Sequence, residues 1–166
     1  MTIIAFDGTT LAADKCATIS SLGITVTKIF RVPQGLLGIS GDYARSQHIL
    51  HWFRKHNGDP QHCPSFQLDN DDYLHLLLIK PPKTKPNPNQ LPPNPNKPLK
   101  PKNKPTIWKY EYSAYPYQIE DDYYALGSGK DFALAAMYLG QTAHEAVLTA
   151  CVFDVHCGMG IDLLTL

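Results

Sequence analysis

Thr2 is the residue whose place in the chain most directly indicates a chemistry. A second residue as small as threonine favours removal of Met1, which would leave a hydroxyl and a free α-amine on one residue. A hydroxyl is a weak nucleophile at neutral pH, whereas an α-amine with a pKa of about 7.7 to 8.0 is close to the ideal for a general base. The first two residues therefore allow a nucleophile that carries its own base. The plain alternative is an ordinary threonine after a start methionine.

Two charged residues could tune such an amine. Lys28 lies alone in an otherwise apolar segment, and a nearby ammonium lowers the pKa of an amine because it disfavours a second positive charge. Asp14 follows two alanines at the end of the first expected hairpin, where the chain returns beside Thr2. The alternative for Lys28 is an edge lysine whose stem packs on the protein while its ammonium stays in water.

Other site chemistries fit the sequence poorly. The segment GSGKD (127–131) lacks two residues of a phosphate-binding P-loop and the third glycine of a dinucleotide-binding motif. His48 and His51 could share a helix face, and His156 precedes Cys157, but no set of three or four ligands has the spacing of a known metal site. We therefore expect no metal and no cofactor.

The 166-residue chain has the length of one ordinary domain, and its 15 basic and 15 acidic residues give a formal net charge of zero. This balance is uneven, because residues 80–105 contain seven lysines, ten prolines and no acid, and the rest of the chain is acidic. We expect residues 80–105 to form a disordered loop insertion that joins two strands of a single domain. Such a loop could bind an acidic partner or nucleic acid, but a solvated loop is the simpler interpretation, and we expect no nucleic-acid partner.

Cysteine usage and hydropathy predict the compartment. The four cysteines have no C-x-x-C spacing, and the sequence shows neither a secretory leader nor an apolar run long enough for a membrane span. We therefore expect reduced thiols in a cytoplasmic protein that has no membrane partner.

The hydrophobic pattern predicts an α+β protein in which helices cover two sheets. Turns at residues 7–8 and 33–35 predict two hairpins. The expected strands cover residues 2–6, 10–13, 24–32, 36–39, 73–79, 106–113, 123–126 and 161–166. Helices are expected at 43–55 and 131–139, and a third begins at the capping box formed by Thr142 and Glu145. Asp154 is expected near the end of that third helix, on its inward-facing stripe.

Six short segments, spread over nearly the whole chain, share their order and approximate spacing with one known family. They are TIIAF (2–6), LAADKCAT (11–18), VTKIFRV (26–32), GISG (38–41), YALGSG (124–129) and DVHCG (154–158). In this order they resemble proteasome β-type subunits, and they look most similar to HslV-type threonine peptidases and to small proteasome-like proteins of phages. Residues 59–72 and 80–105 lie outside the resemblance. It implies an N-terminal nucleophile hydrolase fold, which is an αββα four-layer sandwich of two antiparallel sheets between helix layers.

The resemblance implies roles for four residues near the start of the chain. Thr2 would be the nucleophile, Asp14 would orient Lys28, and Lys28 would tune the α-amine. The backbone N–H of Gly41 would stabilise the oxyanion. Counting from the Ala-Phe pair instead places Met1 at the nucleophile position, but the Thr2 register shortens the first hairpin by an even number of residues, which preserves strand facing and favours Thr2.

Three later residues would complete the site. The resemblance implies that Ser128 hydrogen-bonds near the amine and that Asp154 supports both Ser128 and the N-terminus. Cys157 stands where the family usually has a serine, and a thiol is the poorer hydrogen-bonding group.

These residues predict a threonine-type endopeptidase that cleaves polypeptide substrates. The resemblance further implies a homo-oligomeric ring and an ATPase unfoldase as partner. Two alternatives stay open. One is a catalytically silent proteasome-like scaffold or binding protein, in which a retained Met1 makes the Thr2 nitrogen an amide that cannot act as a base. The other is an N-terminal nucleophile amidase that acts on small molecules.

Overall fold

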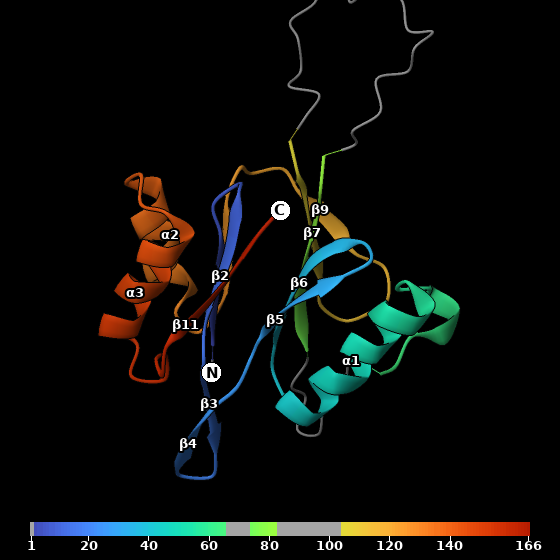
Figure 1. The fold of residues 1–166 in the computed structure, drawn as a ribbon, viewed down its shortest axis with the longest axis horizontal. Helices are drawn as coiled ribbons and strands as arrows, with labels where there is room; N and C mark the ends of the chain where they lie inside the picture. The colour runs from blue at the N-terminus through green and yellow to red at the C-terminus, as the bar shows by residue number, and fades with distance from the viewer. Residues whose placement is uncertain (1, 66–73, 83–103) are drawn as a thin grey trace, which may run out of the picture.

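The computed structural model describes residues 2–65, 74–82 and 104–166, and Figure 1 shows how their helices and strands are arranged. The α-helices are α1 (Tyr43–His56), α2 (Lys130–Tyr138) and α3 (Ala143–Phe153), and a short 3₁₀ helix covers Pro60–His62. The strands are β1 (Ile3–Phe6), β2 (Thr10–Asp14), β3 (Cys16–Ile19), β4 (Leu22–Thr25), β5 (Ile29–Val32), β6 (Gly35–Ser40), β7 (His75–Lys80), β8 (Thr106–Tyr110), β9 (Tyr117–Ile119), β10 (Tyr124–Gly127) and β11 (Ile161–Thr165).

The strands of the described residues form three antiparallel sheets. A four-stranded sheet has the order β10-β1-β2-β11, a five-stranded sheet has the order β5-β6-β7-β8-β9, and β3 and β4 form a separate ribbon. The expected N-terminal hairpin is confirmed as β1 and β2, with Ile4 opposite Ala13. On its other side β1 pairs with β10, where Ile3 lies opposite Gly127. The start of the chain is therefore held between two strands in the middle of a sheet.

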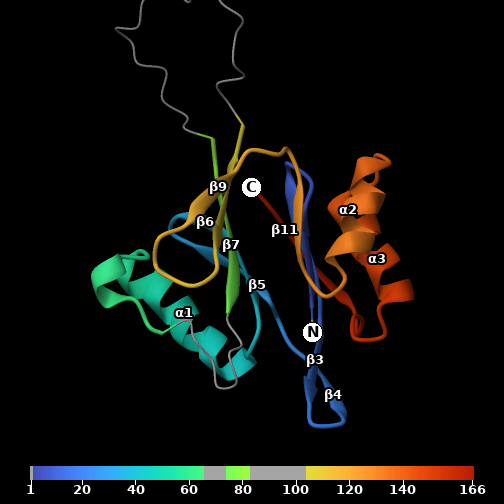
Figure 2. The ribbon, with the colours of Figure 1, turned by 180° about the vertical axis from the view of Figure 1, so that it is seen from behind.

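The two large sheets lie next to each other, and each is covered by helices on its outer side. Figures 1 and 2 show α2 and α3 against the four-stranded sheet and α1 beyond the five-stranded sheet. Side chains along β1 alternate between these surroundings. Ile3 and Ala5 pack toward α2 and α3, whereas Ile4 and Phe6 pack against residues of the other sheet. The chain thus has a mixed α/β fold.

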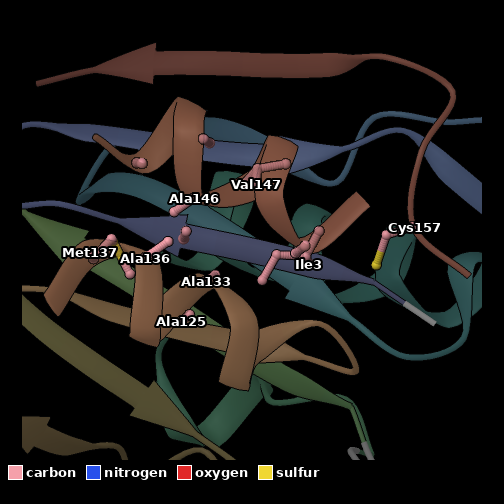
Figure 3. Close-up of a cluster of buried hydrophobic side chains, with 12 residues drawn as sticks. Ile3, Ala125, Ala133, Ala136, Met137, Ala146, Val147 and Cys157 are labelled. Carbon is pink, nitrogen blue, oxygen red and sulfur yellow. The ribbon is translucent and has the colours of Figure 1, made fainter. Parts of the chain in front are cut away.

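Small side chains form the contact between the helix pair and the four-stranded sheet (Figure 3). Ala133 and Ala136 of α2 and Ala146 and Ala150 of α3 are buried in one cluster with Ile3. Because each alanine projects only a methyl group, the helices can approach the sheet closely. This short approach brings the end of α3 near the first residues of the chain.

Asp7 links the first hairpin turn to the start of α3. Its carboxylate accepts a hydrogen bond from the Thr10 N–H at 2.8 Å and another from the Ala143 N–H at 2.8 Å. Burial of the carboxylate opposes ionisation, but the N–H donors outweigh it and lower the pKa of Asp7. The predicted capping box of Thr142 and Glu145 is confirmed and completes this helix start.

The expectation of a single strand at 24–32 is wrong. Residues Leu22–Thr25 form β4, which pairs with β3, and β5 of a different sheet begins only at Ile29. Between the two strands the Val26 N–H donates to the Lys15 carbonyl at 2.8 Å, and the Lys28 side chain turns inward. The alternating pattern continues through these residues, so it could not show that the chain leaves one sheet for another.

Most other expected elements are confirmed, including the helices at 43–55, 131–139 and after Thr142. Strands β3 and β9 were not predicted. The flanks of the expected loop at 80–105 belong to β7 and β8, which pair directly, with Lys80 opposite Thr106. Residues 83–103 of that loop, and residues 66–72 of the polar segment before β7, lie outside the described residues.

Leu77 tests the packing between the two large sheets, because it is fully buried there. We expect Leu77→Ala to lower the free energy of unfolding by about 2 to 5 kcal/mol, since the lost groups leave a cavity. Urea unfolding followed by circular dichroism measures the change. Leu22→Ala, at a position 67% exposed on the ribbon, is the matched control and should change stability by less than about 0.5 kcal/mol. Equal stabilities of the two variants would contradict this packing.

Candidate functional site

Asp14 is the central acceptor of the candidate site. It is fully buried, and its Oδ1 accepts from the Lys28 ammonium at 2.7 Å and from the Ile3 N–H at 2.9 Å. Its Oδ2 accepts from the N–H groups of Cys16 and Gly158, each at 3.1 Å. One carboxylate therefore joins the start of β1, the end of β2, the link before β5 and the loop after α3.

Lys28 is buried as well, with 5% of its side chain exposed. Besides Asp14, its ammonium donates to the Cys16 carbonyl at 2.5 Å. Its own carbonyl accepts from the Ile39 N–H at 3.0 Å, which fixes the link to β6. The alternative of an edge lysine with its ammonium in water is therefore wrong. Desolvation of this ammonium is compensated by the carboxylate and the carbonyl that it contacts.

Thr2 is held in place by hydrogen bonds to the two residues that follow β10. Its N–H donates to Ser128 Oγ at 3.3 Å, and its carbonyl accepts from the Gly129 N–H at 3.4 Å. Gly127 has φ +104°, and a Cβ there would lie 2.0 Å from the Thr2 carbonyl oxygen. Only glycine therefore allows β10 to approach the start of the chain this closely.

A cavity of about 370 Å³ opens beside Thr2. Thr2, Lys28 and Gly41 all line it, together with residues of the β3–β4 ribbon, β5 and the first turn of α1. Gly41 follows β6 with φ +125° and precedes Asp42, the N-cap of α1. The nucleophile, the ammonium and the oxyanion donor expected from the sequence thus face one hollow. Its wall is mainly apolar, with Val26 and Ile39 buried in it.

Ser128, Asp154 and Cys157 form a second group on the other side of Thr2. Asp154 is the C-cap of α3 rather than part of its inward stripe, and its carboxylate accepts from Cys157 Sγ at 3.3 Å. Burial opposes its ionisation, but hydrogen bonds from Ser128 and from the His156 N–H outweigh it and lower the pKa of Asp154. Ser128 therefore lies between the Thr2 nitrogen and a carboxylate held in its charged form.

The thiol of Cys157 differs from that carboxylate. Burial, with the nearby charge of Asp14 and the hydrogen bond to Asp154, raises the pKa of Cys157 to about 12. The group is a neutral donor at physiological pH, which is the state that its contact with Asp154 requires.

The other six site residues expected from the sequence thus lie in two groups around Thr2. Asp14, Lys28 and Gly41 lie on one side, and Ser128, Asp154 and Cys157 lie on the other. The sequence did not predict the Cys16 carbonyl as an acceptor for Lys28 or the Gly158 N–H as a donor to Asp14. Both are backbone groups, which every residue carries, so no residue type could have marked them.

Residues 2–65, 74–82 and 104–166 contain neither a cluster of metal-ligating side chains nor a helix that could span a membrane. No group of three or more His, Cys, Asp or Glu side chains is placed to hold a metal ion. No helix in this part of the chain is long and apolar enough to span a membrane.

Comparison with known proteins gives a likeness of fold. No family model and no curated protein matches the sequence. BPH of Thiobacillus denitrificans matches 100% of this chain with 97% of its own, at a TM-score of 0.65 and 16% identity. The same protein in complex with epoxomicin matches with a TM-score of 0.61 at 17% identity, covering 100% of this chain and 98% of that one. Anbu (ancestral beta-subunit) from Yersinia bercovieri covers 99% of this chain and 80% of its own, at a TM-score of 0.62 and 12% identity.

These structures correct the family suggested by the sequence. At such identities they show the fold alone, and that fold is similar to BPH and to Anbu, which is proteasome-like. The assignment to HslV-type peptidases and small phage proteins is wrong, because Anbu is related to HslV but distinct from it. The six segments are short and widely spaced, so they could indicate the general proteasome-like pattern without separating its branches.

The buried ion pair of Lys28 and Asp14 should make each partner essential to the stability of the fold. We expect Asp14→Asn and Lys28→Met each to lower the free energy of unfolding by about 3 to 5 kcal/mol, because each leaves an uncompensated buried group. The double variant should lose less than the sum of the two. Denaturant unfolding of the four proteins measures this coupling.

The half-exposed pair of Lys15 and Asp162, 24% and 27% exposed, provides the matched control cycle. Its coupling should not exceed about 1 kcal/mol. Additive losses at Asp14 and Lys28 would contradict their mutual dependence.

Cys157 should resist alkylation in the native protein. The thiolate is the reactive species, and raising the thiol pKa from 9.0 to about 12 lowers its population at pH 8 by about a thousandfold. Mass spectrometry after a pulse of iodoacetamide, with and without urea, measures the rate at each cysteine. Labelling of Cys157 at the same rate in folded and unfolded protein would contradict the assigned environment.

Proposed function

We propose that the chain is an N-terminal threonine hydrolase that cleaves peptide bonds with Thr2 after removal of Met1. One observation carries the proposal. Oδ1 of Asp14 accepts from both the Ile3 N–H and the Lys28 ammonium, which holds that ammonium within two hydrogen bonds of the Thr2–Ile3 peptide. Thr2 and Lys28 also line the same cavity. A buried ammonium that lines the same cavity as Thr2 disfavours protonation of an amine on Thr2 and thereby leaves that amine available as a base.

The proposed reaction begins when Thr2 Oγ attacks the carbonyl carbon of the substrate peptide while the α-amine takes the hydroxyl proton. The carbonyl electron pair moves onto oxygen, and the backbone N–H of Gly41 donates to this oxyanion. When the C–N bond breaks, the proton passes from the ammonium to the leaving amine, and an ester on Thr2 remains. Water then attacks the ester with the same amine as base, which releases the acid and restores Thr2.

The remaining residues hold the reacting groups of Thr2 and Lys28 in position. Asp14 fixes the Lys28 ammonium, and three backbone N–H groups fix Asp14. Ser128 holds the nitrogen of Thr2, and Asp154 accepts from Ser128 and from Cys157. A nitrogen that Ser128 holds in one place is what proton transfer from the hydroxyl of the same residue needs.

The fold comparison supports the proposal without identifying a substrate. BPH, whose fold is similar, has a solved structure in complex with epoxomicin, a threonine protease inhibitor. Figures 1 and 2 show the helix pair α2–α3, the four-stranded sheet, the five-stranded sheet and α1 in this order. We propose that these layers form the αββα four-layer sandwich of N-terminal nucleophile hydrolases. We also propose a homo-oligomeric ring and an ATPase unfoldase partner, as the resemblance of the sequence to proteasome β-type subunits implies, and a cytoplasmic location, as the cysteine usage predicts.

A second candidate is a catalytically silent scaffold of the same fold. Thr2 is only 4% exposed, and with Met1 retained its nitrogen is an amide that donates to Ser128 but accepts no proton. In that state the same hydrogen bonds would hold the N-terminus as a purely structural element.

Thr2→Ala separates these functions. We expect the purified protein to lack Met1 by intact-mass measurement and to hydrolyse short fluorogenic peptides. Thr2→Ala should reduce hydrolysis to background because it removes the attacking hydroxyl, while the unfolding midpoint stays within a few degrees. Epoxomicin should add its mass to the parent chain and not to the variant.

Thr165→Ala is the matched control, because Thr165 is an exposed threonine of β11 that the mechanism does not use. It should retain full turnover. A chain that has lost Met1, is folded and neither hydrolyses peptides nor reacts with epoxomicin would overturn the hydrolase proposal and favour the scaffold.

A further inference from the structure

The last turn of α1 carries cations that have no carboxylate partner. Arg54 and Lys55 are exposed there, and α1 itself contains no acidic residue. The nearest acid in the sequence, Asp59, is engaged by His62 at 3.1 Å. Several lysines elsewhere in the described residues form ion pairs with carboxylates, whereas Arg54 and Lys55 form none there. This end of the helix therefore offers positive charge to a neighbouring molecule.

Histidines extend this basic surface. The rings of His51 and His56 lie edge to face with their centroids 6.4 Å apart, and His56 stacks on His62 at 4.3 Å. Desolvation, together with the nearby charges of His62, Lys55 and His51, lowers the pKa of His56. The cations at this end of α1 therefore repel one another, and a carboxylate placed beside them would relieve that repulsion.

A groove of the opposite charge lies between α2 and the connection from β9 to β10. It has a volume of about 860 Å³, and the exposed acids Glu120 and Asp121 line it. Neither of these carboxylates forms an ion pair within residues 2–65, 74–82 and 104–166. The neighbouring Asp122, in contrast, pairs with Lys104. The groove thus presents two acids whose charge the described residues do not compensate.

Apolar side chains line the same groove. Tyr138 and Leu139, at the end of α2, are 79% and 80% exposed, and Tyr123 and Leu134 also line it. Guanidinium groups stack on tyrosine rings, and the stems of long basic side chains cover apolar surface. A groove that combines carboxylates with tyrosine side chains therefore suits arginine and lysine better than it suits an uncharged ligand.

The two surfaces lie on opposite sides of one chain. Figures 1 and 2 show α1 beyond the five-stranded sheet and α2 beyond the four-stranded sheet, so both sheets separate them. The basic end of α1 therefore does not reach the groove of its own chain, whereas it is open to the groove of a second copy. Such a contact joins two different surfaces, so it repeats from copy to copy and forms a ring where the rotation closes.

We propose that the basic end of α1 of one copy binds in the acidic tyrosine groove of the next copy. Arg54 and Lys55 pair with the two carboxylates, and the stems of their side chains pack on Tyr138 and Leu139. Exposed ion pairs contribute little affinity, so they select which surfaces meet, while burial of the apolar side chains supplies most of the attraction. The inference rests on the homo-oligomeric ring of the proposed function and not on the hydrolysis of peptides.

Reversal of the charges on each surface tests this contact. Sedimentation velocity measures the size of the full chain across the micromolar range, where we expect the parent chain to be an oligomer. One double variant carries Arg54→Glu with Lys55→Glu, and the other carries Glu120→Lys with Asp121→Lys. Each variant alone should need a concentration at least about tenfold higher to associate, because like charges then meet at the contact.

An equimolar mixture of the two variants should assemble again. The reversed helix end of one variant matches the reversed groove of the other, and the two unchanged surfaces match as well. The mixture should therefore sediment as the parent chain does, with the two variants alternating, and native mass spectrometry measures their one-to-one ratio.

A matched control changes the net charge elsewhere. Arg31→Glu with Lys130→Glu removes the same two positive charges as the α1 variant, at exposed positions outside both surfaces. It should sediment as the parent chain does. Unfolding curves verify that every variant folds.

Three results would overturn this contact. A parent chain that stays monomeric throughout the micromolar range would remove it together with the ring. Unchanged association of both charge variants would show that copies meet through another surface. A mixture of folded variants that fails to assemble would show that the end of α1 and the groove do not bind each other. Hydrolysis is not a readout here, so a chain that assembles in this pattern without cleaving peptides would contradict the proposed hydrolase alone.

Discussion

The buried ion pair of Asp14 and Lys28 is the constraint on which the rest of the site depends. Moving two charges out of water costs several kcal/mol for each ion, and their attraction compensates this cost only when further hydrogen bonds complete the pair. Here the completing groups are the N–H groups of Ile3, Cys16 and Gly158 and the Cys16 carbonyl. Four segments of the chain must therefore meet at one carboxylate, and the position of Thr2 follows from that meeting.

A steric constraint acts beside this electrostatic one. A Cβ on Gly129 would come within 3.0 Å of the Ala150 methyl and 3.2 Å of Ile3 Cβ. Gly127 is similarly confined by the Thr2 carbonyl. Small residues on β10 and α3 thus allow three elements to crowd around the start of the chain. This close packing places Asp154, at the end of α3, where it accepts a hydrogen bond from Ser128. Ser128 in turn accepts from the Thr2 N–H.

The sequence predicted the parts of this arrangement that depend on residue type. Helix periodicity and the capping box at Thr142 located the helices, and the chemistry of Thr2 and Lys28 indicated the site before any contact was known. It missed the ribbon of β3 and β4, because two strands that leave the body of the protein have no buried face to impose alternation. It joined β4 to β5 because the inward turn at Lys28 is caused by a partner 14 residues away in sequence. The backbone donors and acceptors of the site could not be predicted, because every residue carries such groups.

The fold shows where acidic residues lie relative to the lysine-rich stretch of the sequence. A net charge on the whole body exerts little attraction on a segment of opposite sign, since salt at about 0.1 M screens exposed charges beyond roughly 10 Å. Only carboxylates close to the segment can matter, and Glu120, Asp121 and Asp122 lie next to the residues that flank it. The formal neutrality of the sequence is therefore less informative than the position of three acids. They lie at the end of the molecule opposite to the β3–β4 ribbon, whereas the cavity beside Thr2 is lined by that ribbon. The cavity beside Thr2 and the hollows lined by the three acids accordingly have no lining residue in common.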